Sequence, residues 1–378
     1  MLGARRNGPH HGGMTQYLGA LPLFTRGHYV REMKADLPAS VFSRATSRLA
    51  FIPVHVALIA LGIVAIARGL VPWFVVPIVS VGIGAAFAGL TFVGHELLHG
   101  AIIGGARRRH VLGWLTFLPF TLSPRLWKAW HNRVHHATTN FAEDPDAYPM
   151  LARYETGRGA RFAIDAFSLG GRRLRGVLCL LLGFTVQSTH QLVAAHRTGT
   201  LDRGNRRRAI AETAAGVALW VAVAFAIGPI PFLFAYVLPL SVANVIVMAF
   251  IVTNHSLSPR VPIDDPLISG LSVTTPRAIT WLTLGFGAHV EHHLFPSMST
   301  RHAPAVRAAV LARWPERFQE MPLPAALGLL HNTARVYRDA TTLIDPRSGA
   351  TFPTLMPRPA ATACERRPGE PTLLSQAA

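Results

Sequence analysis

Three groups of histidines carry the strongest chemical signal in the sequence, because each group is spaced to fit one face of a helix. Residues that are three or four positions apart lie above one another on a helix surface, and imidazole is the commonest side-chain metal ligand. Eight of the 18 histidines fall in these groups. They are His95 and His99, then His131, His135 and His136, then His289, His292 and His293.

Eight imidazoles are more than a single four- or six-coordinate ion needs. The pattern therefore predicts two metal ions side by side. Imidazole is compatible with zinc, copper, iron and nickel, so the spacing alone leaves the identity of the metal open.

Long apolar blocks are the elements that must position these groups. The chain is 50% hydrophobic and only 15% charged, a share of charge well below that of an ordinary soluble domain. About 20 apolar residues are enough for a helix to cross the bilayer core. The blocks predict an all-α integral membrane protein with two transmembrane helical hairpins, whose four spans lie at about residues 51–67, 71–93, 209–228 and 230–253.

Two weaker apolar runs are expected to lie at the membrane surface without crossing the bilayer. Residues 111–122 are too few to span it. Residues 177–195 carry several polar side chains, among them Gln187 and His190. With these runs set aside, an even number of crossings separates all three histidine groups, so the groups can meet on one side.

The distribution of arginine predicts which side that is. Arg and Lys are almost absent from the two hairpin turns and crowd the segments before, between and after the hairpins. By the positive-inside rule, both termini and the long middle segment are cytoplasmic. We therefore expect a multi-pass protein with a cytoplasmic helical cap that carries a histidine-rich di-metal site. His255 ends the last span at the same depth as His95 and His99, and it is a ninth candidate ligand.

The net charge of +18 (37 basic minus 19 acidic residues) is explained by anionic lipid head groups at the membrane surface. A basic chain can also bind nucleic acid. No basic-aromatic recognition module is present in the sequence, so we expect membrane lipids and no nucleic acid among its partners.

Two proline signals predict the helices that carry the second and third histidine groups. Ser123-Pro124 is typical of a cap followed by proline in the first turn, and it begins a helix that runs through His136. Trp127 within this helix suits the membrane interface. Thr275-Pro276 gives the same signal for a helix that ends in His293.

Two other functions fit part of the pattern. His95-Glu96-x-x-His99 is the zinc-protease motif, in which Glu96 is the general base, and residues 143–146 offer a third ligand. An intramembrane metalloprotease leaves the other two groups unexplained. A metal transporter places its ionisable residues at the bilayer midplane, whereas these histidines collect at one boundary.

The arrangement resembles the membrane fatty acid desaturase family, within the wider desaturase and hydroxylase superfamily. The resemblance covers roughly residues 40–345 and includes the order of the histidine groups and the two hairpins. The matching motifs lie at residues 94–100, 130–136, 144–146 and 289–296.

This resemblance implies an O2-dependent di-iron oxidoreductase that introduces a cis double bond into a membrane-lipid or carrier-bound acyl chain. It implies that the eight grouped histidines are iron ligands and that His255 is an additional one. Two electrons per turnover would come from a separate ferredoxin, cytochrome or reductase. The same-superfamily alternative is a hydroxylase or ketolase that acts on a fatty acid or a carotenoid.

Polar side chains beside the histidines are expected to orient the imidazoles and to offset the metal charge. The candidates are Glu96, Asp144, Asp146, Asn254 and Glu291.

The sequence divides into three parts. Residues 1–48 form a cytoplasmic N-terminal arm and residues 49–345 form the membrane desaturase domain. Residues 346–378 are rich in Pro, Thr, Arg and Ala, and this composition predicts a disordered tail.

Overall fold

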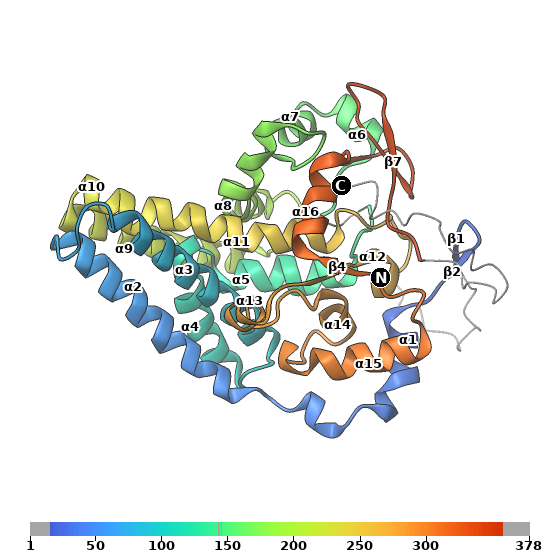
Figure 1. Ribbon diagram of the computed structural model, residues 1–378, viewed down its shortest axis with the longest axis horizontal. Coiled ribbons are helices and arrows are strands. Elements are labelled where there is room, and N and C mark those ends of the chain that lie inside the picture. The colour runs from blue at the N-terminus through green and yellow to red at the C-terminus, as the bar shows by residue number, and fades with distance from the viewer. Residues whose placement is uncertain (1–15, 143, 145, 358–378) are drawn as a thin grey trace, which may run out of the picture.

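Helices make up most of the protein, and the longest of them extend together toward one end of the molecule (Figure 1). The computed structural model describes residues 16–142, 144 and 146–357. In this part of the chain, five helical segments are long and apolar enough to cross a membrane. They are Ala39–Ala67, Val76–His99, Leu174–Ala194, Arg203–Ile227 and Pro229–His255. Four correspond to the predicted spans, and Leu174–Ala194 holds the run expected at the membrane surface, so five segments qualify where four were predicted.

The first hairpin joins α2 (Phe51–Ala67) to α3 (Val76–His99). α2 presents apolar side chains outward, as a membrane-facing surface does, and 68% of Leu61 is exposed. α3 is packed between α2, α4 and α11. Small residues allow this close packing. A Cβ on Gly84 would stand only 2.7 Å from the carbonyl oxygen of Pro239.

The second hairpin joins α9 (Arg203–Ile227) through a short helix, α10 (Pro229–Phe232), to α11 (Leu238–His255). A π-helical turn, Leu233–Val237, separates α10 from α11. Pro239 explains this turn, because it lacks the N–H that a continuous α-helix would bond to the carbonyl four residues earlier.

Helix α8 (Val177–Ala194) is tied to α11 by a buried amide. Asn244 Oδ1 accepts a hydrogen bond from the backbone N–H of Thr185 at 3.0 Å, and Asn244 Nδ2 donates to Thr185 Oγ1 at 2.9 Å. Asn244 is fully buried. Because an unpaired buried amide is costly, these bonds hold the two helix backbones at a fixed separation. Two short helices precede α8, namely α6 (Leu151–Thr156) and α7 (Arg158–Phe167).

The second histidine group lies on a helix that begins at the predicted cap. α4 (Ala106–Phe117) packs on α3, and α5 (Pro124–Trp127) follows it. Ser123 Oγ accepts a hydrogen bond from the N–H of Arg125 at 3.1 Å, so the predicted cap is confirmed. α5 continues as a π-helical turn, Lys128–Val134, and then as a 3-10 turn, His135–Ala137.

The prediction of a single helix from Thr275-Pro276 to the third histidine group is wrong. The chain forms α13 (Arg277–Leu282) and, after a turn, α14 (His289–Leu294). Leu284 has φ 55° and Gly285 has φ 73° in that turn. A right-handed helix cannot continue through two left-handed residues. The other helices of this region are α12 (Pro266–Ser269), α15 (Ala303–Arg313) and α16 (Leu323–Asn332).

The described part of the chain also contains three small sheets, all of them away from the hairpin turns (Figure 1). β1 (Gln16–Leu18) pairs antiparallel with β2 (Leu21–Leu23), and β3 (Ser272–Thr274) pairs parallel with β4 (Glu320–Pro322). The third sheet contains β5 (Val336–Tyr337), β6 (Thr342–Ile344) and β7 (Thr351–Pro353).

Strand β7 corrects the expected boundary of the disordered tail. It lies inside residues 346–378, yet it pairs with β6, and Phe352 packs against a buried cluster that includes Tyr337 and Leu343. This apolar contact and the strand pairing offset the cost of ordering the segment. Residues 358–378 of the expected tail lie outside the described residues.

The N-terminal arm is packed against the third histidine group. Tyr29 and Met33 of α1 (Arg26–Met33) are completely buried, in a cluster that includes Val290 and Leu294 of α14. A buried ion pair between Arg317 and Asp265, 2.8 Å apart, lies beside Tyr29. The arm and the C-terminal helices therefore pack together at the histidine-bearing end of the long helices, and we call this part the cap.

Candidate metal centre

The structure brings the three histidine groups and His255 together at one end of the spans. The first set of imidazoles comes from three elements and contains His95, His99, His131 and His292, with one ring nitrogen of each within 4.8 Å of the others. The second set meets the same distance and contains His135, His255, His289 and His293.

His136 lies between the two sets. Its Nε2 is 3.2 Å from Nε2 of His131 and 3.2 Å from Nε2 of His292, both in the first set. Its ring centroid is 4.3 Å from that of His293 in the second set. The nine histidines thus form one continuous cluster of imidazoles.

The nitrogen positions fit metal binding. Nε2 of His95 and Nε2 of His131 are 3.2 Å apart, and the corresponding atoms of His255 and His289 are 2.6 Å apart. Two imidazoles bound at right angles to one ion at about 2.1 Å have nitrogens about 3 Å apart. Buried polar atoms normally have partners, yet His99 Nε2 has no hydrogen-bond partner among the described residues. The donor set therefore suits two metal ions.

Burial sets the protonation state of those clustered histidines that lie outside the candidate membrane spans. It lowers the pKa of His131, His136, His289 and His293 well below the usual value, and the neighbouring histidines lower it further. These imidazoles are therefore neutral near pH 7. The neutral form is the one that binds a metal ion.

His135 differs from these histidines because it has carboxylate partners. Burial opposes its charged form, but Asp144 and then Asp146 raise the pKa of His135 to about 9. His135 Nδ1 is 3.1 Å from Asp144 Oδ1 and 3.4 Å from Asp146 Oδ2. Without a metal ion, His135 is therefore protonated on both nitrogens near pH 7, and a metal ion bound at Nε2 would displace that proton while the carboxylates hold the one on Nδ1.

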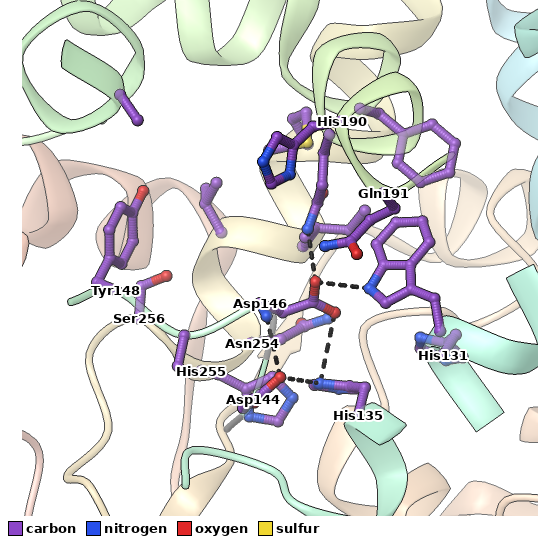
Figure 2. Close-up of a pocket in the computed structure, with 18 of the residues that line it drawn as sticks. His131, His135, Asp144, Asp146, Tyr148, His190, Gln191, Asn254, His255 and Ser256 are labelled. Carbon is purple, nitrogen blue, oxygen red and sulfur yellow. Dashed lines mark hydrogen bonds and ion pairs between the residues drawn. The ribbon is translucent and has the colours of Figure 1, made fainter. Parts of the chain in front are cut away.

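Asp146 connects His135 to two other elements (Figure 2). Its Oδ1 accepts hydrogen bonds from Trp130 Nε1 at 2.9 Å and from Gln187 Nε2 of α8 at 2.6 Å. Asp144 and Asp146 therefore both contact the Nδ1 side of the His135 ring. The sequence indicated no such partner for His255, whose Nδ1 donates to the carbonyl of Ser269 at 2.7 Å.

Glu96 and Glu291 were expected to orient imidazoles, but they bond elsewhere. Glu96 is ion-paired with Arg48 and accepts hydrogen bonds from the backbone N–H of Thr300 at 2.8 Å and from Ser299 Oγ at 3.2 Å. The zinc-protease motif requires this carboxylate to activate a metal-bound water. Its position in the Arg48 pair does not fit that role.

Glu291 is the corresponding carboxylate of the third histidine group. It accepts hydrogen bonds from Ser272 Oγ at 2.6 Å and from Arg307 Nε at 2.6 Å. Both glutamates share a helix with histidines and point to arginines of the cap. They anchor the histidine-bearing helices. Asn254 is buried, and its Oδ1 has no partner among the described residues.

Two residues support the cluster in ways that the sequence did not indicate. Trp127 was expected at the membrane interface, but it is buried and its ring stacks on His131 at 4.6 Å between centroids. Asn140 has φ 59°, a conformation that asparagine adopts more readily than most residues. Its N–H donates to Asp144 Oδ2 at 2.8 Å, and its Nδ2 donates to the carbonyl of His255 at 3.3 Å. The only sequence signal that could have identified Asn140 is its position just after the second histidine group.

A cavity of about 950 Å³ borders the cluster. Both sets of imidazoles contribute to its wall, through His95 and His131 of the first and His135, His255 and His289 of the second. On the other side lie His190 and Gln191 of α8 (Figure 2). The part between the spans is apolar and is lined by Phe92, Phe117, Phe184, Val247, Met248 and Ile251.

Comparison with known proteins agrees with these features. A family profile described as "Fatty acid desaturase" matches residues 17–323. The chloroplastic omega-6 fatty acid desaturase of Spinacia oleracea is 22% identical over 302 residues, which cover 76% of this chain and 64% of that protein. The sn-1 oleoyl-lipid 12-desaturase of Arthrospira platensis is 25% identical over 272 residues, covering 68% of this chain and 74% of that protein.

A third relative matches a shorter stretch. It is the sn-1 acyl-lipid omega-3 desaturase (ferredoxin) of Synechocystis, 32% identical over 123 residues, which cover 32% of this chain and 34% of that protein. The family match contains all nine clustered histidines, both hairpins and most of the cap. The chain belongs to the fatty acid desaturase family.

Proposed function

We propose that the protein is an O2-dependent fatty acyl desaturase that introduces a cis double bond into a membrane-lipid or carrier-bound acyl chain. One observation supports the proposal most strongly. Both sets of imidazoles border one cavity, and the part of that cavity between the spans is apolar. A methylene chain in the cavity would lie directly against the cluster.

The two sets of imidazoles are proposed to hold two iron ions, with His136 completing the first set. When bound, the iron pair would use O2, two electrons and two protons to remove two hydrogens from neighbouring carbons, leaving a double bond and two waters. The protein's part is to hold and orient the ligands. Asp144 and Asp146 keep the His135 proton on Nδ1, and the Ser269 carbonyl does the same for His255.

The wall of the cavity is proposed to position the substrate. Aromatic and aliphatic side chains such as Phe92 and Val247 favour an acyl chain and exclude water from the reacting carbons. The names of the Arthrospira and Synechocystis relatives specify lipid-bound acyl chains, which supports a lipid substrate here.

The electron donor is proposed to be a separate protein, as the name of the Synechocystis relative indicates for that enzyme. We place the cluster and both termini on the cytoplasmic side, because arginine is enriched in the cap and scarce in the hairpin turns.

Expression in a host with a competent electron donor tests the proposal. Gas chromatography with location of the double bond should reveal an added unsaturated fatty acid. His135→Ala should abolish it while the protein stays in the membrane. His196→Ala is the matched control, because His196 is exposed and lies outside the cluster. An unchanged lipid profile, or a hydroxylated or ketolated product, would contradict desaturation.

A further inference from the structure

The apolar end of the cavity has a floor formed by α11. The residues of α11 that line the cavity begin at Val247 and Met248 and continue to His255. Met248 precedes His255 by seven positions, which corresponds to about 10 Å along the helix axis. The floor is therefore about 10 Å below the imidazoles on this side.

Met248 rests directly on a glycine of α8. A Cβ built on Gly183 would stand 2.9 Å from Met248 Cε, 3.1 Å from Cγ and 3.2 Å from Sδ. Real Cβ contacts are almost never this short, so any side chain at position 183 must displace the thioether chain. Methionine is unbranched and flexible and yields more easily than a backbone does.

The backbones of α8 and α11 are held together, so they do not move apart to relieve this contact. Two positions away from Gly183, Thr185 is bonded through its N–H and its hydroxyl to the buried amide of Asn244, which lies one helical turn before Met248. Separating α8 from α11 would break these bonds in a buried place. Met248 lines the cavity, so a side chain displaced from Gly183 can move into that space.

We infer that the contact between Gly183 and Met248 sets the depth of the cavity, and with it the length of acyl chain that fits beyond the reacting carbons. The inference rests on the proposed function for the identity of the ligand as an acyl chain. Gly183 permits the Met248 side chain to lie flat on α8, and a larger residue there would shorten the cavity. Truncating Met248 would deepen it.

Two substitutions therefore have opposite expected effects. Met248→Ala removes the thioether end and should shift the preference toward chains that are about two carbons longer. Gly183→Ala should shift it toward shorter chains. The ratio of products from two chains should change by about fourfold for each methylene admitted or excluded, the factor that corresponds to burying one CH2. In the double variant, Gly183→Ala should lose its effect, because the side chain that it displaces is absent.

The readouts are the product ratio from acyl chains of graded length and the thermal stabilisation of the purified protein by saturated phospholipids of graded chain length. The second does not depend on turnover, so it tests the cavity depth even if the wild type makes no desaturated product. Such a lack of product would contradict the proposed function alone. Shifts in the same direction, or unchanged chain-length profiles in both readouts, would overturn the inference.

Two further variants distinguish an effect on cavity depth from an effect on folding. Gly82→Ala is the matched glycine control, because a Cβ there meets nothing within 4 Å, and it should leave both profiles unchanged. Met248→Val removes less of the side chain and should give an intermediate shift. It keeps the test decisive if the alanine variant does not accumulate.

Discussion

The substitution Glu96→Gln tests whether the Glu96 carboxylate anchors its helix or takes part in the reaction. The wild-type carboxylate is ion-paired with Arg48, and it accepts hydrogen bonds from the N–H of Thr300 at 2.8 Å and from its hydroxyl at 2.6 Å. Glutamine has the same shape but no charge: its amide oxygen can accept from the donors that meet Glu96 Oε1, and its NH2 group would face Ser299 Oγ. The substitution therefore leaves Arg48 without a counter-charge in a place where little solvent can screen it.

The structure gives the magnitude of the effect. The exposed fractions of the Arg48 and Glu96 side chains are 12% and 4%, so the pair is close to fully buried. Hydrogen bonds to charged groups contribute about 1.5–3 kcal/mol each, and removing one partner of a buried pair costs about 3–5 kcal/mol. We expect Glu96→Gln to lower the free energy of unfolding by about 2–3 kcal/mol and Glu96→Ala to lower it by about 3–5 kcal/mol.

The assay is unfolding in detergent micelles, with desaturated product measured per folded molecule. A double-mutant cycle with Arg48→Met isolates the pair, and we expect a coupling energy of about 2 kcal/mol. Folded Glu96→Gln protein should keep most of its turnover, because Glu96 does not point toward the cavity. A variant with unchanged stability and bound metal but no turnover would refute this reasoning and restore Glu96 as a general base.

Two further predictions follow from the cap and the cluster. Burial raises the pKa of Asp264 to about 6 from the usual 3.8, so its favourable contribution is present below about pH 4 and is lost as the pH rises through 6. Asp264→Asn should thus raise the unfolding temperature at pH 8 by roughly 2–4 °C and leave it unchanged at pH 4, and the opposite pattern would be inconsistent with a raised pKa. His136→Ala should lower the iron content without unfolding the protein, because its Nε2 faces the first set at 3.2 Å, and full iron retention in elemental analysis would remove it from the ligands.

Much of the fold follows from local patterns that the sequence states directly. Helix α2 coincides with the apolar block at Phe51–Ala67, which Arg48 precedes and Arg68 follows. The helix N-cap at Ser123 depends only on residues next to it in the sequence, because Ser123 Oγ accepts from the N–H of Arg125. The two hairpins account for the meeting of the three histidine groups, but Leu174–Ala194 is also long and apolar enough to cross a membrane, so local hydropathy alone does not set the number of crossings between the groups.

The remaining features depend on contacts between distant parts of the chain. Glu96 lies between histidines, and nothing nearby shows that its partners are Arg48 and Thr300, which come from the arm and from beyond the third group. The break at Leu284 places a leucine in a left-handed conformation, which its side chain does not favour. Trp127 has the amphipathic character of an interfacial residue, but packing on His131 buries it.

The metal content of the purified protein tests the central claim most directly. Elemental analysis by mass spectrometry should find about two iron ions per chain, one for each set of imidazoles. His99→Ala and His289→Ala should each reduce the content to about one, because the two residues belong to different sets. One zinc ion per chain and no iron, with His289→Ala unchanged, would contradict a di-iron desaturase.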